Sequence, residues 1–416
     1  MLRMVETFSG IGAQAKALSN INCDFDILNT ADWDINAIIA YDIIHNKEQD
    51  LSDYEYKNRE ELLAKIMPLT LSTDGKKPAT KEALKRLNIN VLRRLCAAID
   101  RSKNLISVTD IKGRDLPDEM NILTYSFPCQ DLSIAHAWHG SDTGGIDRNA
   151  NNRSSMLWQI ERVLKERKEE DLRLPRFLLM ENVRNITSKQ HEKNFKEWQK
   201  SLEDLGYYNH IYKLNAKDFG MPQNRVRVYM LSFLVEDNLE LKNNIRNYLN
   251  NHNLEDIRYT REIIRNNKKV DEILRVDYSI PLYKKEADAN QINDTKSRRD
   301  ICAKNSILYD YNKFIDLVPT ITTKQDRHPN SGVIKYNNLK KGKCDFRYLT
   351  PRECFMLMGF DEADFQLLMD NNFLCNKNGN FFSDSKLIKM AGNSIVVNVL
   401  EEIFKQINFI DENIYF

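Results

Sequence analysis

The sequence predicts an α/β protein built on a doubly wound, mostly parallel sheet, together with a second, smaller domain. Short apolar segments alternate with helix-like segments through the first 235 residues, as in strands joined by crossover helices. A glycine-containing turn follows the first apolar segment, as at the first strand–helix junction of nucleotide-binding sheets. After residue 236 the chain becomes rich in Asn and charged residues and loses this regular periodicity.

The elements of the first half can be placed in order. Residues 46–104 interrupt the alternation, and apolar residues at helical spacing over 80–101 predict a helical insertion there. Helices are also expected through Leu18, at 35–45, at 156–166 and through Leu205. Strands are expected at 3–8, 27–31, 122–126, 177–181, 209–214 and 226–235.

The second half is expected to contain the smaller domain, over residues 236–385. Thr350-Pro-Arg-Glu353 has the residues of a capping box with proline at the first helical position, which predicts a helix that ends near Gly359. A last helix is predicted to open at Gly392-Asn-Ser394 and to run over 395–404. Residues 386–416 would then return to the first domain, which covers 1–235.

Composition limits the classes of function. The 61 basic and 60 acidic residues give a net charge of +1, so any binding of nucleic acid must depend on local charge. Seven cysteines without a CxxC pair suggest neither a metal site nor a disulfide framework, and they fit a reducing cytoplasm. Without an apolar run of about 18 residues or a signal peptide, we expect no membrane association.

Pro128-Cys129-Gln130 is the strongest candidate for chemistry. The thiol follows the strand expected at 122–126, and α/β proteins bind their ligands at the carboxyl ends of strands. A long polar segment, 131–153, comes next and is expected to close over a substrate. A single cysteine is more often a small buried hydrophobic residue, so the assignment needs support from other segments.

Phe8-Ser-Gly10-Ile-Gly12 lies between an expected strand and an expected helix, where glycines let the backbone pass close to a ligand. Asp32 ends the next strand, so it is placed to accept hydrogen bonds from ribose hydroxyls, with Trp33 stacking on an adenine. The alternative is simple turn formation. The pattern fits a dinucleotide or S-adenosylmethionine and does not choose between them.

Glu181 closes the strand expected at 177–181. A buried carboxylate is costly unless it is paired or in use, so Glu181 is either a loop cap or an acid that faces the same crevice as Cys129. Arg225 and Arg227 alternate along a strand and are expected to point to one face. They would fix the carboxylate or the polar edge of a substrate, unless they belong to a solvated sheet edge.

Together these segments resemble the DNA (cytosine-5)-methyltransferases over nearly the whole chain, and the catalytic half resembles the CpG-methylating branch. The resemblance implies an S-adenosylmethionine-dependent, Rossmann-like catalytic domain with a small target-recognition domain, of restriction-modification or orphan type. The segments stand in the order of the family: Phe8-Ser-Gly10-Ile-Gly12, Asp32-Trp33, Pro128-Cys-Gln130, Arg153-Ser154, Glu181-Asn-Val183, Gln223-x-Arg225-x-Arg227, 347–359 and Gly392-Asn-Ser394.

The resemblance implies a covalent mechanism on a flipped-out cytosine. C5 of cytosine is a weak nucleophile until a thiolate adds to C6, and the base must leave the duplex to expose C6. Cys129 would be the nucleophile and Glu181 would hold N3, while Arg225 and Arg227 would support the base and Glu181. The cofactor would lie against Phe8, Gly10, Ile11, Gly12, Asp32, Trp33, Ser107, Val108, Pro128, Asn393 and Ser394.

Two positions depart from the family. An acid is usual near the adenine at the end of the third strand, but the matching stretch here is Ile106-Ser107-Val108, so the contact is made by a serine or is lost. In some relatives a serine fills the space that the flipped-out cytosine leaves in the DNA duplex. The matching position here is Ala135. His136 or His139 is the alternative.

The resemblance places target reading between Arg227 and the capping box. Residues 324–347 hold seven basic and two acidic side chains, a local excess suited to phosphates, although a solvated charged loop is the alternative. Candidate DNA contacts are Gln130, Ser133, Arg153, Thr320, Lys324, Arg327, His328, Lys335 and Arg347.

Three other functions compete with this interpretation. A tRNA cytosine-5 methyltransferase would share the catalytic residues. A NAD-dependent dehydrogenase would use Gly10-x-Gly12 but leaves Cys129 and Glu181 unexplained, and a non-catalytic DNA-binding protein need not combine them. We expect a monomer that acts on double-stranded DNA in a bacterial cytoplasm, associated with the nucleoid, with a cognate restriction endonuclease as a candidate partner.

Overall fold

A computed structural model describes residues 1–47, 49–128, 146–148, 154–338, 340–376 and 379–415. The chain divides into two compact units. The sheet unit comprises Met1–Leu214, Val226–Tyr259 and Leu400–Phe416, and the small unit comprises Asn215–Arg225 and Thr260–Val399. The predicted division at 236 and 386 stays a prediction.

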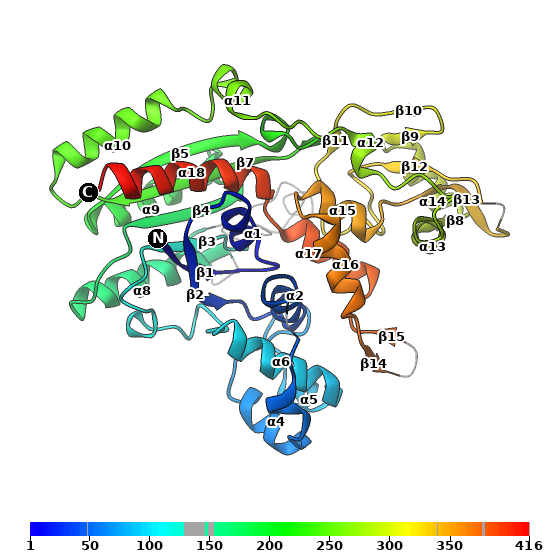
Figure 1. The fold of residues 1–416 in the computed structure, drawn as a ribbon, viewed down its shortest axis with the longest axis horizontal. Helices are drawn as coiled ribbons and strands as arrows, with labels where there is room; N and C mark the ends of the chain where they lie inside the picture. The colour runs from blue at the N-terminus through cyan, green and yellow to red at the C-terminus, as the bar shows by residue number, and fades with distance from the viewer. Residues whose placement is uncertain (48, 129–145, 149–153, 339, 377–378, 416) are drawn as a thin grey trace. The chain divides into compact units, whose positions relative to one another are not determined.

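The sheet unit is built on a six-stranded sheet with the order β2-β1-β3-β4-β7-β5 (Figure 1). The first four strands in this order are parallel, and β7 runs antiparallel to β4, which confirms the mostly parallel sheet. The strands are β1 (Leu2–Thr7), β2 (Phe25–Ala31), β3 (Ile122–Tyr125), β4 (Phe177–Val183), β5 (Tyr207–Asn215) and β7 (Val226–Leu234).

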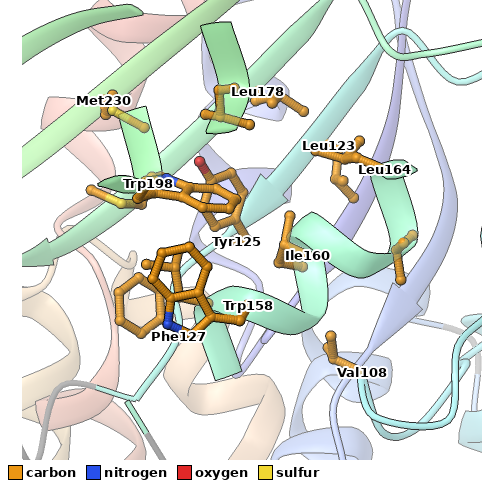
Figure 2. Close-up of a cluster of buried hydrophobic side chains, with 14 of the residues drawn as sticks. Val108, Leu123, Tyr125, Phe127, Trp158, Ile160, Leu164, Leu178, Trp198 and Met230 are labelled. Carbon is orange, nitrogen blue, oxygen red and sulfur yellow. The ribbon is translucent and has the colours of Figure 1, made fainter. Parts of the chain in front are cut away.

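Helices cover this sheet, and the central strands are consequently buried along almost their whole length. Part of the core is an aromatic cluster in which Trp198 packs edge-on against Tyr125 and Trp158, with both pairs of ring centroids 5.7 Å apart (Figure 2). The helices are α1 (Ala13–Asn20), α2 (Ile35–Asn46), α8 (Leu157–Glu169), α9 (Glu192–Asp204), α10 (Leu239–Asn251), α11 (Ile257–Ile263) and α18 (Val397–Asn413), of which α11 and α18 continue into the small unit.

Residues 46–104 contain four helices, of which α6 packs against α2 (Figure 1). The helical pattern expected over 80–101 is divided in two, because Thr80 and Asn88 each cap a separate helix. The helices are α3 (Ser52–Glu55), α4 (Arg59–Ile66), α5 (Lys81–Lys85) and α6 (Ile89–Arg101). Short 3₁₀ helices elsewhere in the chain span Gly113–Asp115, Ser154–Met156, Arg184–Thr187 and Ala216–Phe219.

The small unit contains a five-stranded sheet with the order β10-β9-β12-β13-β8. These strands are β8 (Gln291–Asn293), β9 (Ile307–Asp310), β10 (Lys313–Phe314), β12 (Val333–Lys335) and β13 (Lys343–Arg347). Two further pairs join β6 (Gln223–Asn224) to β11 (Val318–Pro319) and β14 (Leu374–Asn376) to β15 (Gly379–Asn380). The helices are α12 (Val270–Ile273), α13 (Pro281–Ala289), α14 (Lys296–Ala303), α15 (Pro351–Leu357), α16 (Glu362–Asp370) and α17 (Asp384–Asn393).

The two helix starts predicted in the second half have different outcomes. Thr350 and Glu353 form the predicted capping box of α15, with Pro351 at the first position. The prediction that the last helix opens at Gly392 is wrong, because Gly392 and Asn393 end α17 and the last helix begins at Val397. Within the described part of the chain, no helix is long and apolar enough to span a bilayer.

Candidate active site

The turn after β1 lies at the carboxyl edge of the sheet, where the parallel strands end. Phe8, Gly10 and Gly12 all have positive φ angles, of 54°, 55° and 76°. A Cβ on Gly12 would lie 2.1 Å from Nε2 of His45, so only glycine fits there. A Cβ on Gly10 would have no atom of a described residue within 4 Å. The turn therefore leaves open space over Gly10, while Ile11 is buried and its carbonyl lies 3.0 Å from Nε2 of His45.

Asp32 directly follows β2 and orients this turn. One carboxylate oxygen accepts a hydrogen bond from the backbone N–H of Gly10 at 2.9 Å, and the other accepts one from Asp34 at 2.8 Å. Phe8 and Trp33 are partly exposed on the same edge. Open space over Gly10, a carboxylate and two accessible aromatic side chains have the chemistry that a nucleoside needs. The contact predicted between Asp32 and ribose hydroxyls stays a prediction.

The loop that follows α6 is fastened to the same edge. The side-chain oxygen of Asn104 accepts hydrogen bonds from the backbone N–H groups of Asp32 and Ile106, at 3.2 and 2.7 Å. Ser107 and Val108 are buried in this loop, where Ser107 hydrogen-bonds Thr109 at 2.7 Å. Residues 105–108 form a loop with Ile106 at a φ of 66°, and not the strand end that the resemblance led us to expect.

Two carboxyl groups at this edge were missed by the sequence interpretation. Asp110 is an exposed acid three residues after Ser107, and its proximity to that position was the available signal. Glu6 is fully buried in β1, where Tyr41 donates a hydrogen bond to its carboxyl group at 3.1 Å. Burial raises the pKa of Glu6 to about 8, with a further increase from the charge of Asp32 and opposing hydrogen bonds from Tyr41 and Gln14.

Glu181 lies near the end of β4, one strand along from β3. Its carboxylate pairs with Nε of Arg227 at 3.2 Å, and both side chains are largely but not completely buried. The adjacent Asn182 donates a hydrogen bond from its side chain to the carbonyl of Phe127 at 3.1 Å. This bond fixes the chain two residues before Cys129 to the strand that carries Glu181. The arrangement provides an acid, its cationic partner and the approach to the thiol at one sheet edge.

Arg225 belongs to the small unit, where it donates hydrogen bonds to three backbone carbonyls. The partners are Ile321 at 2.9 Å, Gly392 at 3.1 Å and Ser394 at 2.7 Å. Arg225 therefore joins the segment after β11 to the end of α17. Its predicted support of the base and of Glu181, and the predicted cofactor contacts of Asn393 and Ser394, stay predictions.

The predicted DNA contacts in the small unit differ in their surroundings. Lys324, Arg327 and His328 are exposed between β11 and β12. Thr320 donates a hydrogen bond to the carbonyl of Asn224 at 2.6 Å, and Lys335 forms an ion pair with Asp310 at 2.8 Å. Several predicted site residues lie outside the described part of the chain. They are the nucleophile Cys129, the DNA contacts Gln130, Ser133 and Arg153, and the loop 131–153 with Ala135, His136 and His139, of which only 146–148 are described.

Arg347 corrects the predicted DNA surface. Its side chain is fully buried and forms two hydrogen bonds of 2.8 Å with the carboxylate of Glu353. Tyr278 is 3.0 Å from its Nε. Because Glu353 completes the capping box of α15, Arg347 has a structural position and is not available to a phosphate.

Comparison with known proteins identifies the family. The family model for C-5 cytosine-specific DNA methylase matches residues 81–408. The chain is 33% identical to the orphan methyltransferase M.SssI of Spiroplasma monobiae, covering 98% of this chain and 97% of the relative. It is 31% identical to the type II methyltransferase M2.ScrFI of Lactococcus lactis, covering 98% and 99%.

Solved structures support the fold. The Dnmt2 methyltransferase of S. pombe aligns with a TM-score of 0.60 at 16% identity, covering 99% of this chain and 100% of that one. The Entamoeba histolytica methyltransferase EhMeth aligns with a TM-score of 0.57 at 15% identity. With the family match over most of the chain and relatives that align along its whole length, the protein belongs to the C-5 cytosine-specific DNA methylase family.

Proposed function

We propose that Cys129 is the nucleophile of this DNA (cytosine-5)-methyltransferase and that Glu181, held by Arg227, is the acid that holds N3 of the target cytosine. The ion pair between Glu181 and Arg227 carries this proposal. It keeps a carboxyl group at the sheet edge that Phe127 and Pro128 approach, beside the strand that leads to Cys129.

The chemistry follows from the weak nucleophilicity of C5 in cytosine. The thiolate of Cys129 forms a bond to C6, and Glu181 stabilises a proton on N3, so that the electron pair moves to C5. S-adenosylmethionine would supply an electrophilic methyl group to C5, and the bond from that methyl group to the sulfonium sulfur would break to leave S-adenosylhomocysteine. A base would then remove the C5 proton, and the electron pair of the C5–H bond would form the C5=C6 double bond as the bond between C6 and sulfur breaks, which restores the ring and the thiolate. Arg227 holds Glu181 in place throughout.

Most of the residues proposed to bind the methyl donor follow the ends of neighbouring strands, and this supports the proposal. Asp32 would bind the ribose hydroxyls and Trp33 the adenine, with the turn around Gly10 close to the rest of the molecule. The open space over Gly10 supports this placement. Phe8, Ile11, Gly12, Ser107, Val108, Pro128, Asn393 and Ser394 complete the proposed contacts.

The small unit would read the target sequence. Lys324, Arg327 and His328 are exposed on one connecting segment, where their charge suits phosphates and base edges of duplex DNA. Gln130, Ser133, Arg153, Thr320 and Lys335 would add contacts. We further propose that the protein is a monomer in a bacterial cytoplasm, near the nucleoid, and that a cognate restriction endonuclease accompanies it without forming a stable complex.

The proposal is tested by substituting the thiol. Cys129→Ala should abolish transfer of labelled methyl groups to plasmid DNA while DNA affinity stays nearly unchanged, because the thiol acts only in the chemical step. Cys23→Ala, a partly exposed cysteine of the sheet unit, is the control and should remain active. Duplexes that contain 5-fluorocytosine should form a denaturation-resistant adduct with the wild type and not with Cys129→Ala.

Two results would reject this assignment. One is methyl transfer by Cys129→Ala at the wild-type rate. The other is an equal loss of DNA affinity and activity, which would indicate a binding role. A parallel assay with tRNA distinguishes the related RNA-modifying activity, since transfer to tRNA and not to plasmid DNA would replace the proposed substrate.

A further inference from the structure

The helical insertion carries a concentrated positive charge that the proposed reaction does not use. Residues 76–94 contain seven basic side chains and one acidic side chain, in a protein whose net charge is only +1. Five of the seven are exposed, all on α5 or next to it. They are Lys76, Lys77, Lys81, Lys85 and Arg86, which we call the insertion cations.

The insertion cations differ from the other charged groups of the insertion. Arg101 pairs with Asp42 at 2.5 Å and Lys65 with Asp100, so these cations hold helices together. Among the described residues, the side-chain nitrogens of the insertion cations form no ion pair within 4.0 Å, although the carboxylate of Asp74 accepts hydrogen bonds from the backbone N–H groups of Lys76 and Lys77 at 2.9 and 3.3 Å. Their charge is therefore directed to solvent.

Other exposed helices of the sheet unit balance their charges. On α9, Lys196 pairs with Glu192 and Lys200 with Asp204, both at 2.7 Å and at i,i+4 spacing. A solvated helix that only needs solubility would follow this pattern. Five exposed cations with a single acid between them, Glu82, repel one another, and an anionic partner would relieve this repulsion.

The backbone joins the insertion cations to the carboxyl edge of the sheet. Ser72 is fully buried and forms two backbone hydrogen bonds beyond the end of β2, to the carbonyl of Trp33 at 2.7 Å and from the N–H of Ile35 at 3.0 Å. Its hydroxyl also donates to the carbonyl of Lys77 at 2.6 Å. These hydrogen bonds hold the segment that contains Lys76 and Lys77 beside the end of β2, at the edge that carries the candidate site.

We infer that the insertion cations bind the phosphate backbone of duplex DNA beside the segment that contains the target cytosine. The inference rests on the proposed function, because a flipped base at the carboxyl edge brings its flanking duplex to the same side of the sheet. Lysines without acidic partners suit phosphates as mobile point charges, and they carry no sequence information. The insertion would therefore strengthen binding to any sequence.

The test compares two sets of four substitutions. The insertion variant is Lys76→Gln/Lys77→Gln/Lys81→Gln/Lys85→Gln, and the control is Lys168→Gln/Lys193→Gln/Lys196→Gln/Lys200→Gln, which removes four exposed charges from α8 and α9. Affinity for a 60-bp plasmid fragment is measured from low to moderate salt. Each lost phosphate contact lowers the slope of log Kd against log salt by about 0.9.

We expect the insertion variant to lose about two or more units of this slope, and about tenfold or more in affinity near 100 mM salt. The control should keep the wild-type slope, and both variants should keep wild-type affinity for S-adenosylmethionine and wild-type melting temperature. An unchanged slope in the insertion variant, or an equal decrease in the control, would overturn the inference. If the wild type transfers no methyl group to plasmid DNA, the proposed function has failed instead, so the two failures are distinguishable.

Discussion

The two units position their important residues by different physical means. In the sheet unit the strands are four to nine residues long, and the candidate side chains follow from where these strands end. In the small unit the strands of the main sheet are two to five residues long. Backbone pairing of that length provides little stability, so side chains have to supply the rest.

Buried polar side chains hold the small unit together. Gln223 is fully buried, donates to the carbonyl of Leu357 at 2.7 Å and accepts from the N–H of Ile321 at 3.0 Å. Arg352 is buried and pairs with Glu286 at 2.8 Å. The pair Arg347–Glu353 is completely buried. In the small unit, buried charged pairs therefore stabilise the architecture. In the sheet unit, pairs such as Arg101–Asp42 do the same, while the Glu181–Arg227 pair lies near the strand ends that form the candidate site.

Breaking the buried pair should give the largest effect. Arg347→Leu leaves the Glu353 carboxylate without its cation in a fully buried position, so we expect a loss of about 3–5 kcal/mol in the free energy of unfolding. The loss should be visible by chemical denaturation of the whole chain. DNA affinity should fall with it, because α15 loses the residue that fixes its capping box.

An exposed arginine of the same unit is the matched control. Arg327 lies 3.6 Å from Asp326 with half of its side chain exposed, so Arg327→Leu should change stability by less than about 1 kcal/mol. If both variants lose the same stability, burial of Arg347 is not what stabilises the small unit. Buried and exposed arginines of the small unit would then contribute equally to its stability.

The sequence predicted the strands of the sheet unit better than the buried contacts of the small unit. Strand positions and the order of the motifs depend on local pattern, which one sequence displays. The capping box at Thr350, in the small unit, was predicted for the same reason. The positions of Arg347 and Arg225 depend on partners 6 to 169 residues away. Nothing local distinguishes a buried arginine from one that contacts phosphate, which is why Arg347 was assigned to the DNA surface.

In the candidate site, too, the sequence predicted what depends on local pattern and missed what depends on distant contacts. The roles of Asp32 and Glu181 could be proposed because each lies at the carboxyl end of an apolar segment. The helix start expected at Gly392 was wrong because the backbone there is the end of α17, and glycine suits either end of a helix. Glu6 was overlooked because a single acid inside a strand pattern resembles a solvent-facing residue until the sheet is assembled.

Glu181→Gln tests whether the charged pair near the strand ends of the sheet unit serves the reaction. The amide cannot carry the acid's proton or pair as an ion with Arg227, so we expect methyl transfer to slow by about two orders of magnitude or more. Affinity for S-adenosylmethionine should be retained and the melting temperature should change little. Single-turnover transfer to plasmid DNA measures the rate, and Glu203→Gln on the exposed face of α9 is the control. A wild-type rate in Glu181→Gln would reject its role as the acid.

The smallest effect concerns Glu6, the one strand residue of the candidate edge whose carboxyl group is fully buried without a cation among the described contacts. Its pKa is about 8 in the folded protein, against an ordinary value of 4.5. Between these values the unfolded chain has released the proton and the folded chain retains it. The contribution of Glu6 to stability is therefore fully present below pH 4.5 and is lost as pH rises toward 8.

Glu6→Gln removes this titration, so the melting temperature of the variant should rise relative to the wild type as pH increases from 5 to 9. Glu161→Gln is the opposing control, because burial raises the pKa of Glu161 but hydrogen bonds from Arg148 outweigh it and set the value at about 2. The stability that Glu161 provides is present above pH 4.5 and lost only in more acidic solution, so its difference from wild type should stay constant between pH 5 and 9. A constant difference for Glu6→Gln as well would mean that Glu6 is ionised in the folded protein, so that β1 would bury a charge that has no cation among the described contacts.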